Sequence, residues 1–245
     1  DLVRAGYTPV LAHPVLRSWV PLAIITVSEN PWWTKEKRDP DAREPLLREA
    51  IAVARQVSGD DNEDLASALL LLGQLLIQRN QYVEAEGLLA EALRICRKRT
   101  GDEHPFVPRI LDLLGTALRG QGKFTEAETR YRETLEIQRR LLGEEHPNTL
   151  AWMRKLSSVL DDQGRHAEAE ALAADLIAKW RRRAEESGAS ADDLNAYAWT
   201  LLTIKPADLR DPLAALLPAQ RAVELTARGN ADILDTLALA YQMTG

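Results

Sequence analysis

The chain has 245 residues, with 31 basic and 37 acidic side chains and a formal net charge of −6. Its apolar residues are mainly leucine and alanine, with only two phenylalanines and five tyrosines, which favours helices over strands. The acidic balance argues against a general nucleic-acid-binding protein, and the single cysteine excludes an internal disulfide framework and a cysteine-rich zinc site. No stretch approaches the roughly 20 apolar residues of a membrane helix, and no signal peptide is evident. We expect a soluble, cytoplasmic, helical chain that is part of a longer protein.

Residues 1–40 follow no regular pattern. The first 38 residues carry four prolines and three of the six tryptophans, together with an apolar run over 15–27. We expect this segment to be irregular and its apolar run to pack on the end of the helices that follow, because stacked helical arrays need such caps. A binding arm and the remnant of an upstream domain are the alternatives.

From residue 41 the sequence repeats with a period of 42 residues. Residues 101–105 (GDEHP) return as 143–147 (GEEHP). Segments 63–104 and 105–146 share 15 identities without gaps, where chance gives about two or three. The register predicts a half repeat, three full repeats, a variant repeat and a final half repeat. Their ranges are 41–62, 63–104, 105–146, 147–188, 189–229 and 230–245.

Each full repeat predicts two helices. The apolar residues of the second repeat form two stripes with spacings of three and four residues, which is the period of a helix. The stripes are Leu111, Leu114 and Leu118, then, after a break at 120–122 (GQG), Phe124, Ala127, Tyr131 and Leu135. Pro105 and Pro147 suit the first turn of a helix. Because neither helix can bury its stripe alone, successive pairs must stack into an all-α solenoid of about ten helices.

These repeats resemble the tetratricopeptide repeat in the 42-residue form of the kinesin light chain family, over about residues 41–245. The family's small residue in the first helix (helix A) and its alanine in the second helix (helix B) are both matched. The matching residues are Gly73, Gly115 and Ser157 in helix A, and Ala85, Ala127 and Ala169 in helix B. The resemblance implies a right-handed superhelix that acts as a protein-interaction scaffold without catalysis and holds extended peptides in its concave groove.

The last repeats depart from this pattern. Residues 194–199 (LNAYAW) restore helix A, and a longer linker follows at 205–212 (KPADLRDP). Pro218 lies inside the next predicted helix and is expected to kink it, at about 3 kcal/mol relative to alanine. The linker and its flanks resemble the final repeats in the tails of large bacterial serine/threonine kinases. The alternative function is therefore the repeat tail of such a kinase, whose catalytic domain this chain lacks.

The motifs predict no catalytic activity, no cofactor and no metal site. The chain has no kinase signature and no Walker loop. His104 and His146 occupy equivalent loops and are interpreted as residues of helix starts. Cys96 has no histidine three or four residues away and is interpreted as a plain helical thiol.

Basic clusters recur at the C-terminal ends of the B helices, at 97–99 (RKR), 139–140 (RR) and 181–183 (RRR). Stacked repeats would align them into a basic ridge. One interpretation is a docking strip for an acidic partner. The other is the helix dipole, which favours cations at helix C-termini and acids at N-termini. The clusters lack interleaved aromatic residues, so nucleic acid is not an expected partner.

The predicted partner-binding site is the concave groove lined by the A helices. Mapped by the 42-residue register, it comprises Ser67, Leu70, Gln74, Arg109, Asp112, Thr116, Arg119, Arg154, Ser158, Asn195 and Trp199. Kinesin-light-chain-like repeats usually carry asparagines here, and only Asn195 matches. Arginine binds carboxylates bidentately. We therefore predict an acidic or carboxylate-bearing protein segment anchored by Arg109, Arg119 and Arg154, with Trp199 as an apolar contact; a solvated face is the alternative. Small-molecule ligands and membrane insertion are not expected.

Overall fold

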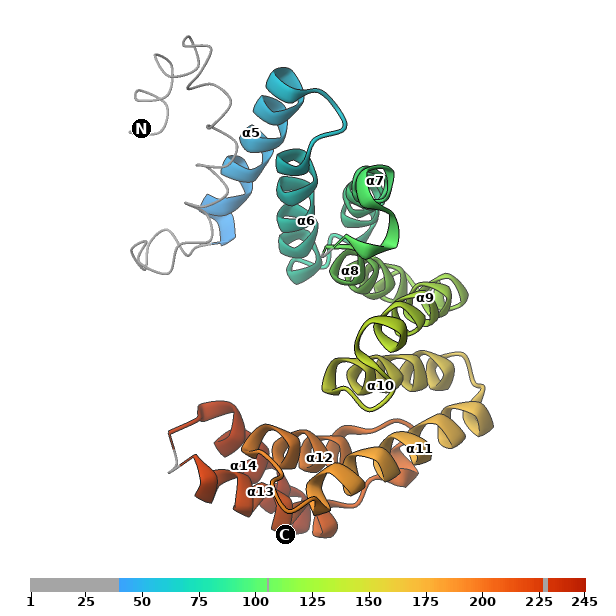
Figure 1. Ribbon diagram of the computed structural model, residues 1–245, viewed down its shortest axis with the longest axis vertical. Coiled ribbons are helices and arrows are strands. Elements are labelled where there is room, and N and C mark those ends of the chain that lie inside the picture. The colour runs from blue at the N-terminus through green and yellow to red at the C-terminus, as the bar shows by residue number, and fades with distance from the viewer. Residues whose placement is uncertain (1–39, 105, 227–228) are drawn as a thin grey trace. The chain divides into compact units, whose positions relative to one another are not determined.

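The computed structural model describes residues 40–104, 106–226 and 229–245, and all regular structure in these ranges is helical (Figure 1). The expected all-α fold is confirmed; segment 1–39, with the proposed cap, and Pro105 lie outside the described residues. No helix within those ranges is long and apolar enough to cross a bilayer. The α-helices are α5 (Pro40–Ser58), α6 (Glu63–Gln78), α7 (Tyr82–Thr100), α8 (Val107–Gly120), α9 (Phe124–Leu142), α10 (Pro147–Asp162), α11 (His166–Glu185), α12 (Ala191–Thr203), α13 (Pro212–Leu225) and α14 (Ala231–Thr244).

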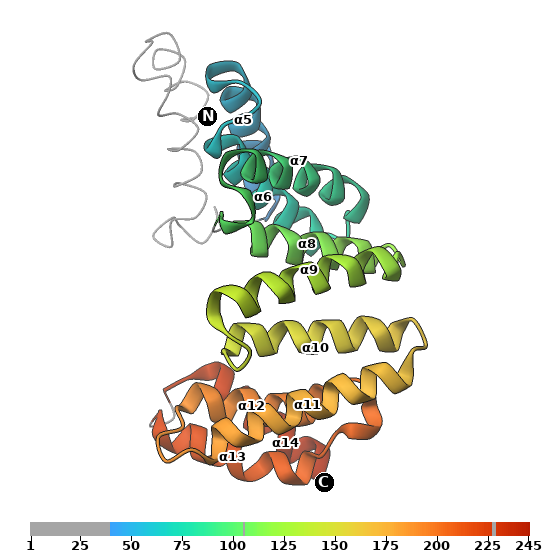
Figure 2. The ribbon, with the colours of Figure 1, turned by 45° about the vertical axis from the view of Figure 1, so that its right-hand side comes forward.

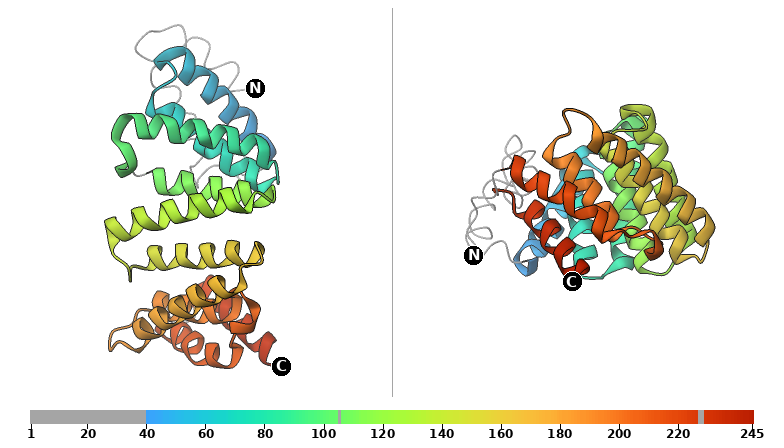
Figure 3. Two further views of the ribbon diagram at one scale, coloured as in Figure 1. Left: turned by 90° about the vertical axis from the view of Figure 1, so that its right-hand side faces the viewer. Right: turned by 90° about the horizontal axis from the view of Figure 1, so that it is seen from below.

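The helices belong to two compact units, the first ending at Lys123 and the second running from Phe124 to Gly245. In the first unit α5 packs on α6, α6 on α7 and α7 on α8 (Figure 1). In the second unit α10 packs between α9 and α11, and Figure 2 shows α9 and α10 running alongside each other. Helix α13 packs on both α12 and α14, in the orange and red part of Figure 3. Each unit is thus a stack of helices in chain order.

Leucines at helical spacing form the core of the first unit. Leu65, Leu69, Leu72 and Leu76 on α6 are at most 1 % exposed. Asn62 begins this helix, because its side chain accepts a hydrogen bond from the Leu65 amide at 2.8 Å. Burial of these side chains, rather than intrinsic helix propensity, supplies most of the stability of such a helix.

Close packing of α6 on α7 depends on Gly73. A Cβ atom built on this glycine would lie 2.7 Å from Cγ of Leu89 on α7, closer than carbon atoms approach. Ser157 takes the equivalent position on α10 and is fully buried. Its hydroxyl has backbone acceptors in Ala169, at 3.0 Å, and in Lys205. The small residue of helix A therefore allows close helix contact in the first unit and anchors the 205–212 linker in the second.

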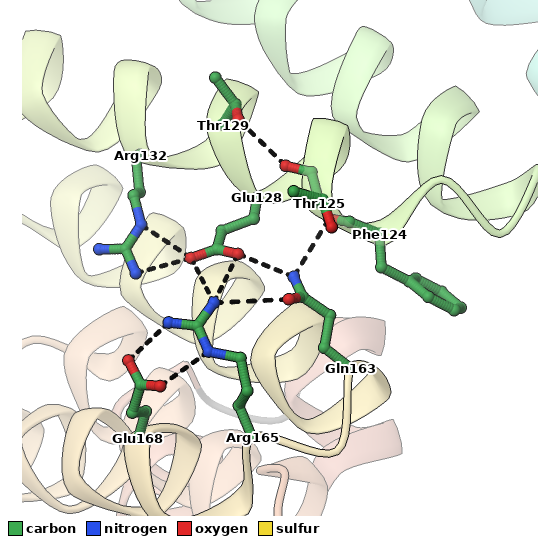
Figure 4. A network of polar contacts seen from close by, with 8 residues as sticks. All are labelled: Phe124, Thr125, Glu128, Thr129, Arg132, Gln163, Arg165 and Glu168. Atoms are coloured by element: carbon green, nitrogen blue, oxygen red, sulfur yellow. Dashed lines mark hydrogen bonds and ion pairs between the residues drawn. The ribbon is translucent and has the colours of Figure 1, made fainter.

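Glutamates near the start of the B helices hold the loop that ends the next helix A. In the first unit, Glu86 on α7 accepts hydrogen bonds from Gln121 at 2.7 Å and Lys123 at 2.9 Å. In the second unit, Glu128 on α9 accepts from Gln163 at 2.8 Å and Arg165 at 2.7 Å, as Figure 4 shows. The two sites are 42 residues apart, so the same set of polar contacts recurs in both repeats. We call the glutamate and its donors from the next helix pair the polar lock.

The variant repeat forms α12 and α13. Helix α13 begins at the cap residue Asp211, which accepts a hydrogen bond from the Ala214 amide at 2.9 Å. The helix continues through Pro218, whose ring is buried. The missing proline N–H therefore does not end the helix, which packs on both α12 and α14.

Candidate functional site

In the first unit, the predicted groove residues lie on α6 and α8 and are largely engaged with the protein itself. Leu70 is buried, at 2 % exposed, and so is not available to a partner. Gln74 accepts a hydrogen bond from Nη2 of Arg109, which links α6 to α8. Asp112, Thr116 and Arg119 also have interaction partners, whereas Ser67 is half-buried. The positive charge predicted here is therefore partly committed to internal contacts.

In the second unit, the predicted residues Arg154 and Trp199 line one pocket of about 260 Å³ between α10, α11 and α12. Ser158 and Asn195 are not among its lining residues, although Asn195 is half-buried and its Oδ1 is buried without a hydrogen-bond partner in the described part of the chain. The lining residues on α10 and α12 are Pro147, Asn148, Leu150, Ala151, Arg154, Asp192, Asp193, Ala196, Trp199 and Thr200, and Trp180 comes from α11.

Arg154 differs from the other two predicted arginines. Within the described residues its guanidinium has no hydrogen-bond or ion-pair partner, whereas Arg109 and Arg119 are both engaged. Burial lowers the pKa of Arg154, yet an arginine side chain stays protonated at working pH. The pocket therefore presents five N–H donors and a positive charge that no described acceptor satisfies.

Trp180 is the pocket residue that the sequence reasoning missed. It lies on helix B, outside the mapped groove, and is only 5 % exposed. Arg183 lies over its ring at 5.9 Å and forms an ion pair with Asp193 at 2.6 Å. A signal was present in the register, because position 180 is equivalent to Cys96 and Gln138 and carries a much larger, aromatic side chain.

Asp193 also lines this pocket, and its carboxylate accepts hydrogen bonds from Arg183 and Ser190. Burial acts to raise its pKa, but hydrogen bonds from Arg183 and Ser190 outweigh burial and lower the pKa below its ordinary value. Ser190 and Asp193 form a reciprocal capping box at the start of α12. Asp192, which directly precedes Asp193 on α12, lines the same pocket and is exposed.

Much of the predicted basic ridge is paired with carboxylates of neighbouring loops and of the first turn of α12. Lys98 and Arg94 both bind Asp61, the latter at 2.7 Å. In the second unit, Arg182 binds Glu145 at 2.6 Å, and Arg183 is paired with Asp193. These pairs favour a structural role at helix C-termini over a free docking strip.

His104 and His146 lie in the loops before α8 and α10, and Cys96 is buried on α7. His146 caps α10, and its Nδ1 accepts a hydrogen bond from the Asn148 amide at 3.2 Å. His104 accepts similarly from the Phe106 amide. Burial raises the pKa of Cys96 to about 11, so this thiol stays protonated and inert. Among the described residues no three potential ligands from His, Cys, Asp and Glu converge as a metal site.

The pairing of helices and the 42-residue register agree with a family profile described as "Tetratricopeptide repeat", which matches residues 39–98, 75–139 and 106–182. Together these matches cover more than half of the chain. The chain belongs to the tetratricopeptide repeat family. No curated protein sequence matches it significantly.

Solved structures of tetratricopeptide repeat proteins share this fold at low sequence identity. A putative kinesin light chain with nearly identical TPR-like repeats from Podosopora anserina is 17 % identical, with a TM-score of 0.60 over 95 % of this chain and 98 % of that chain. BtubC (BKLC) from P. vanneervenii is 19 % identical, with a TM-score of 0.63 over 99 % of this chain and 88 % of that chain. The kinesin light chain-like resemblance is confirmed at the level of the fold.

Proposed function

We propose that this tetratricopeptide repeat chain is a non-catalytic cytoplasmic scaffold that binds a segment of a partner protein on its helix A faces. The observation that carries the proposal is the pocket between α10, α11 and α12. It brings together Arg154 and Trp199, two residues that the repeat register had placed on the partner-facing side. A protein-binding role is the general property of this family.

The composition of the pocket supports recognition of a protein segment rather than chemistry on a substrate. Its walls are mainly apolar, and the polar side chains that line it are those of the unpaired Arg154 and of Asn148, Asp192, Asp193 and Thr200. Tryptophan and arginine are the residue types that contribute most to protein interfaces. A carboxylate on the partner would satisfy Arg154, which agrees with the prediction of a carboxylate-bearing segment.

Site-specific photo-cross-linking tests this proposal. A photoreactive amino acid replaces Asp192, which is exposed at the pocket, and in a matched control replaces Glu170, which is exposed on α11 away from it. In lysate of the native cells, we expect the Asp192 probe to capture a defined set of proteins that the Glu170 probe does not. Equal capture by both probes, or none by either, would refute binding at this face.

The kinase-tail hypothesis is a separate proposal that depends on the linker at 205–212. This linker joins α12 to α13 and is held by the hydrogen bond between Ser157 and the Lys205 carbonyl. Sequencing the gene upstream of Asp1 tests the hypothesis directly. A kinase catalytic motif set in the same reading frame would support it, and an ordinary start codon would refute it.

A further inference from the structure

His146 caps the helix that forms one wall of the pocket between α10, α11 and α12. It is the N-cap residue of α10, and its Nδ1 accepts a hydrogen bond from the Asn148 amide at 3.2 Å. Its carbonyl oxygen accepts a second hydrogen bond, from the Leu150 amide at 3.0 Å. The pocket residues at the start of α10 are Pro147, Asn148, Leu150 and Ala151. The wall therefore begins with the helical turn that His146 holds.

Only the neutral imidazole of His146 can make this cap. An acceptor at Nδ1 requires the ring proton to be on Nε2, and both ring nitrogens are donors once the ring is protonated. The protonated ring would point an N–H group at the Asn148 N–H and place a positive charge at the positive end of the helix dipole. Histidine is the side chain that changes charge between about pH 5 and 8, so mild acid removes the cap.

The other two described histidines each have a carboxylate that compensates for protonation. His104 also accepts a backbone hydrogen bond, but its Nε2 lies 4.0 Å from a carboxylate oxygen of Glu63. The exposed ring of His166 lies 2.8 Å from Asp161. Within the described residues, no carboxylate lies at ion-pair distance from His146. Protonation is thus uncompensated at His146 alone among these three.

The carboxylates of the loop before α10 are already paired with cations. Glu144 lies 3.3 Å from Nζ of Lys179 on α11 and 3.9 Å from Nε of Arg139 on α9. Glu145 pairs with Arg182 on α11 at 2.6 Å. These acids are therefore committed, and the cations beside them oppose a further positive charge at the cap.

Two acids at the start of α12 complete the charged surroundings of this loop. Asp193 is paired with Arg183 at 2.6 Å, and Arg183 also donates to the Glu145 carbonyl oxygen at 3.2 Å. Asp192 is exposed, lines the pocket and has no described cation beside it. Its carboxylate is replaced in the tests below, so that loss of the cap is separated from a new ion pair with the protonated ring.

We propose that His146 is a pH sensor for the pocket. Its neutral ring holds the first turn of α10, and its protonation releases this turn and weakens the binding of a partner. The first part concerns the fold alone, whereas the effect on binding rests on the proposed scaffold function.

Nuclear magnetic resonance of the full, nitrogen-15-labelled chain tests the cap directly. The ring shifts of His146 should show the proton on Nε2 at pH 8, and the Asn148 amide should shift as the ring titrates. Hydrogen exchange measures the release of the first turn. Protection of the Asn148 and Leu150 amides, corrected for the pH dependence of intrinsic exchange, should fall about fivefold from pH 7.5 to 5.5, the usual effect of losing a helix cap.

Matched variants assign the acid response to His146. His146→Asn keeps a cap acceptor that does not titrate and should hold the protection constant between the two pH values. His146→Ser, another capping residue, replaces it if the asparagine variant lacks wild-type circular dichroism. His166→Asn removes an exposed titrating histidine at the start of α11, and Asp192→Asn removes the unpaired acid. Both of these variants should keep the acid response.

Photo-cross-linking with the probe at position 192 tests the effect on binding, in a chain that lacks the Asp192 carboxylate. Capture of partners should fall about twofold or more from pH 7.5 to 5.5 with native His146, because fewer molecules are competent to bind. It should stay constant in the His146→Asn background.

The outcomes separate the sensor from the scaffold proposal. Unchanged protection in the wild type, an equal fall in His146→Asn, or a ring proton on Nδ1 at pH 8 would each overturn the sensor. Loss of protection with equal capture at the two pH values would overturn the effect on binding. No specific capture at pH 7.5 would refute the scaffold proposal itself, and the exchange measurement would still decide whether His146 is a pH-dependent cap.

Discussion

The polar lock around Glu128 should be a main determinant of the stability of the second unit. Glu128 is 7 % exposed and accepts hydrogen bonds from Gln163, Arg132 and Arg165 (Figure 4). Glu128→Gln removes the charge and places an amide among these donors. Hydrogen bonds to charged groups contribute about 1.5–3 kcal/mol each, but Arg132 and Arg165 are 50 % and 36 % exposed, which reduces the total. We expect a loss of about 2 kcal/mol in the free energy of unfolding.

The assay is equilibrium urea denaturation followed by circular dichroism, with thermal unfolding as a second measurement. For a chain of this size, about 2 kcal/mol corresponds to a decrease of about 4–8 °C in Tm. Glu126→Gln is the matched control, because Glu126 lies two residues away on α9 and is exposed. It should change stability by less than about 0.5 kcal/mol. The reasoning is refuted if both variants have the same small effect.

The effect should also depend on pH in a defined direction. Burial acts to raise the pKa of Glu128, but the hydrogen bonds from Gln163, Arg132 and Arg165 outweigh it and lower the pKa below the ordinary value of 4.5. A carboxyl group with a lowered folded-state pKa stabilises the fold above its unfolded pKa and loses that contribution as the pH falls through the folded pKa. The difference between wild type and Glu128→Gln should therefore be full at pH 7 and shrink below about pH 4.5.

Three further outcomes are expected. Glu86→Gln in the first unit should cost less than about 1 kcal/mol in urea denaturation, because Glu86 is 28 % exposed; a loss equal to that of Glu128→Gln would contradict the burial argument. Gly73→Ala should destabilise the protein by about 1–3 kcal/mol, because the added Cβ atom would collide with Leu89. Gly87→Ala, at an exposed site of α7 with no atom within 4 Å of the added Cβ, should stabilise it by up to about 1 kcal/mol. Effects of the same sign for both variants would exclude overpacking as the cause. Cys96 should react with Ellman's reagent at pH 8 about 100-fold more slowly in the folded protein than in urea, since burial raises its pKa to about 11, and equal rates would show that the thiol is accessible.

The sequence by itself determined the helices and their order. Apolar residues spaced by three and four positions fix which face of each helix is buried, and this pattern is local, so it survives without knowledge of any distant contact. Leu111, Leu114 and Leu118 were predicted as one buried stripe and are at most 4 % exposed. The same register placed Arg154 and Trp199 on corresponding faces of α10 and α12, which the structure brings to one pocket.

Only the tertiary structure decided which of the predicted arginines is available. By the 42-residue register, Arg109 corresponds to Ala151 and Arg154 to Asp112, and the register carries no information on acceptors supplied by a neighbouring helix. Packing places Gln74 against Arg109, whereas Arg154 lines a pocket with Trp180 and Trp199 and has no described partner for its guanidinium. Trp180 joins the pocket for the same reason, because a helix B side chain reaches the helix A face only through the way α11 packs between α10 and α12. The pairing of Gln74 with Arg109, 35 residues apart in sequence, depends on this packing, and the packing determines which groups remain available to a partner.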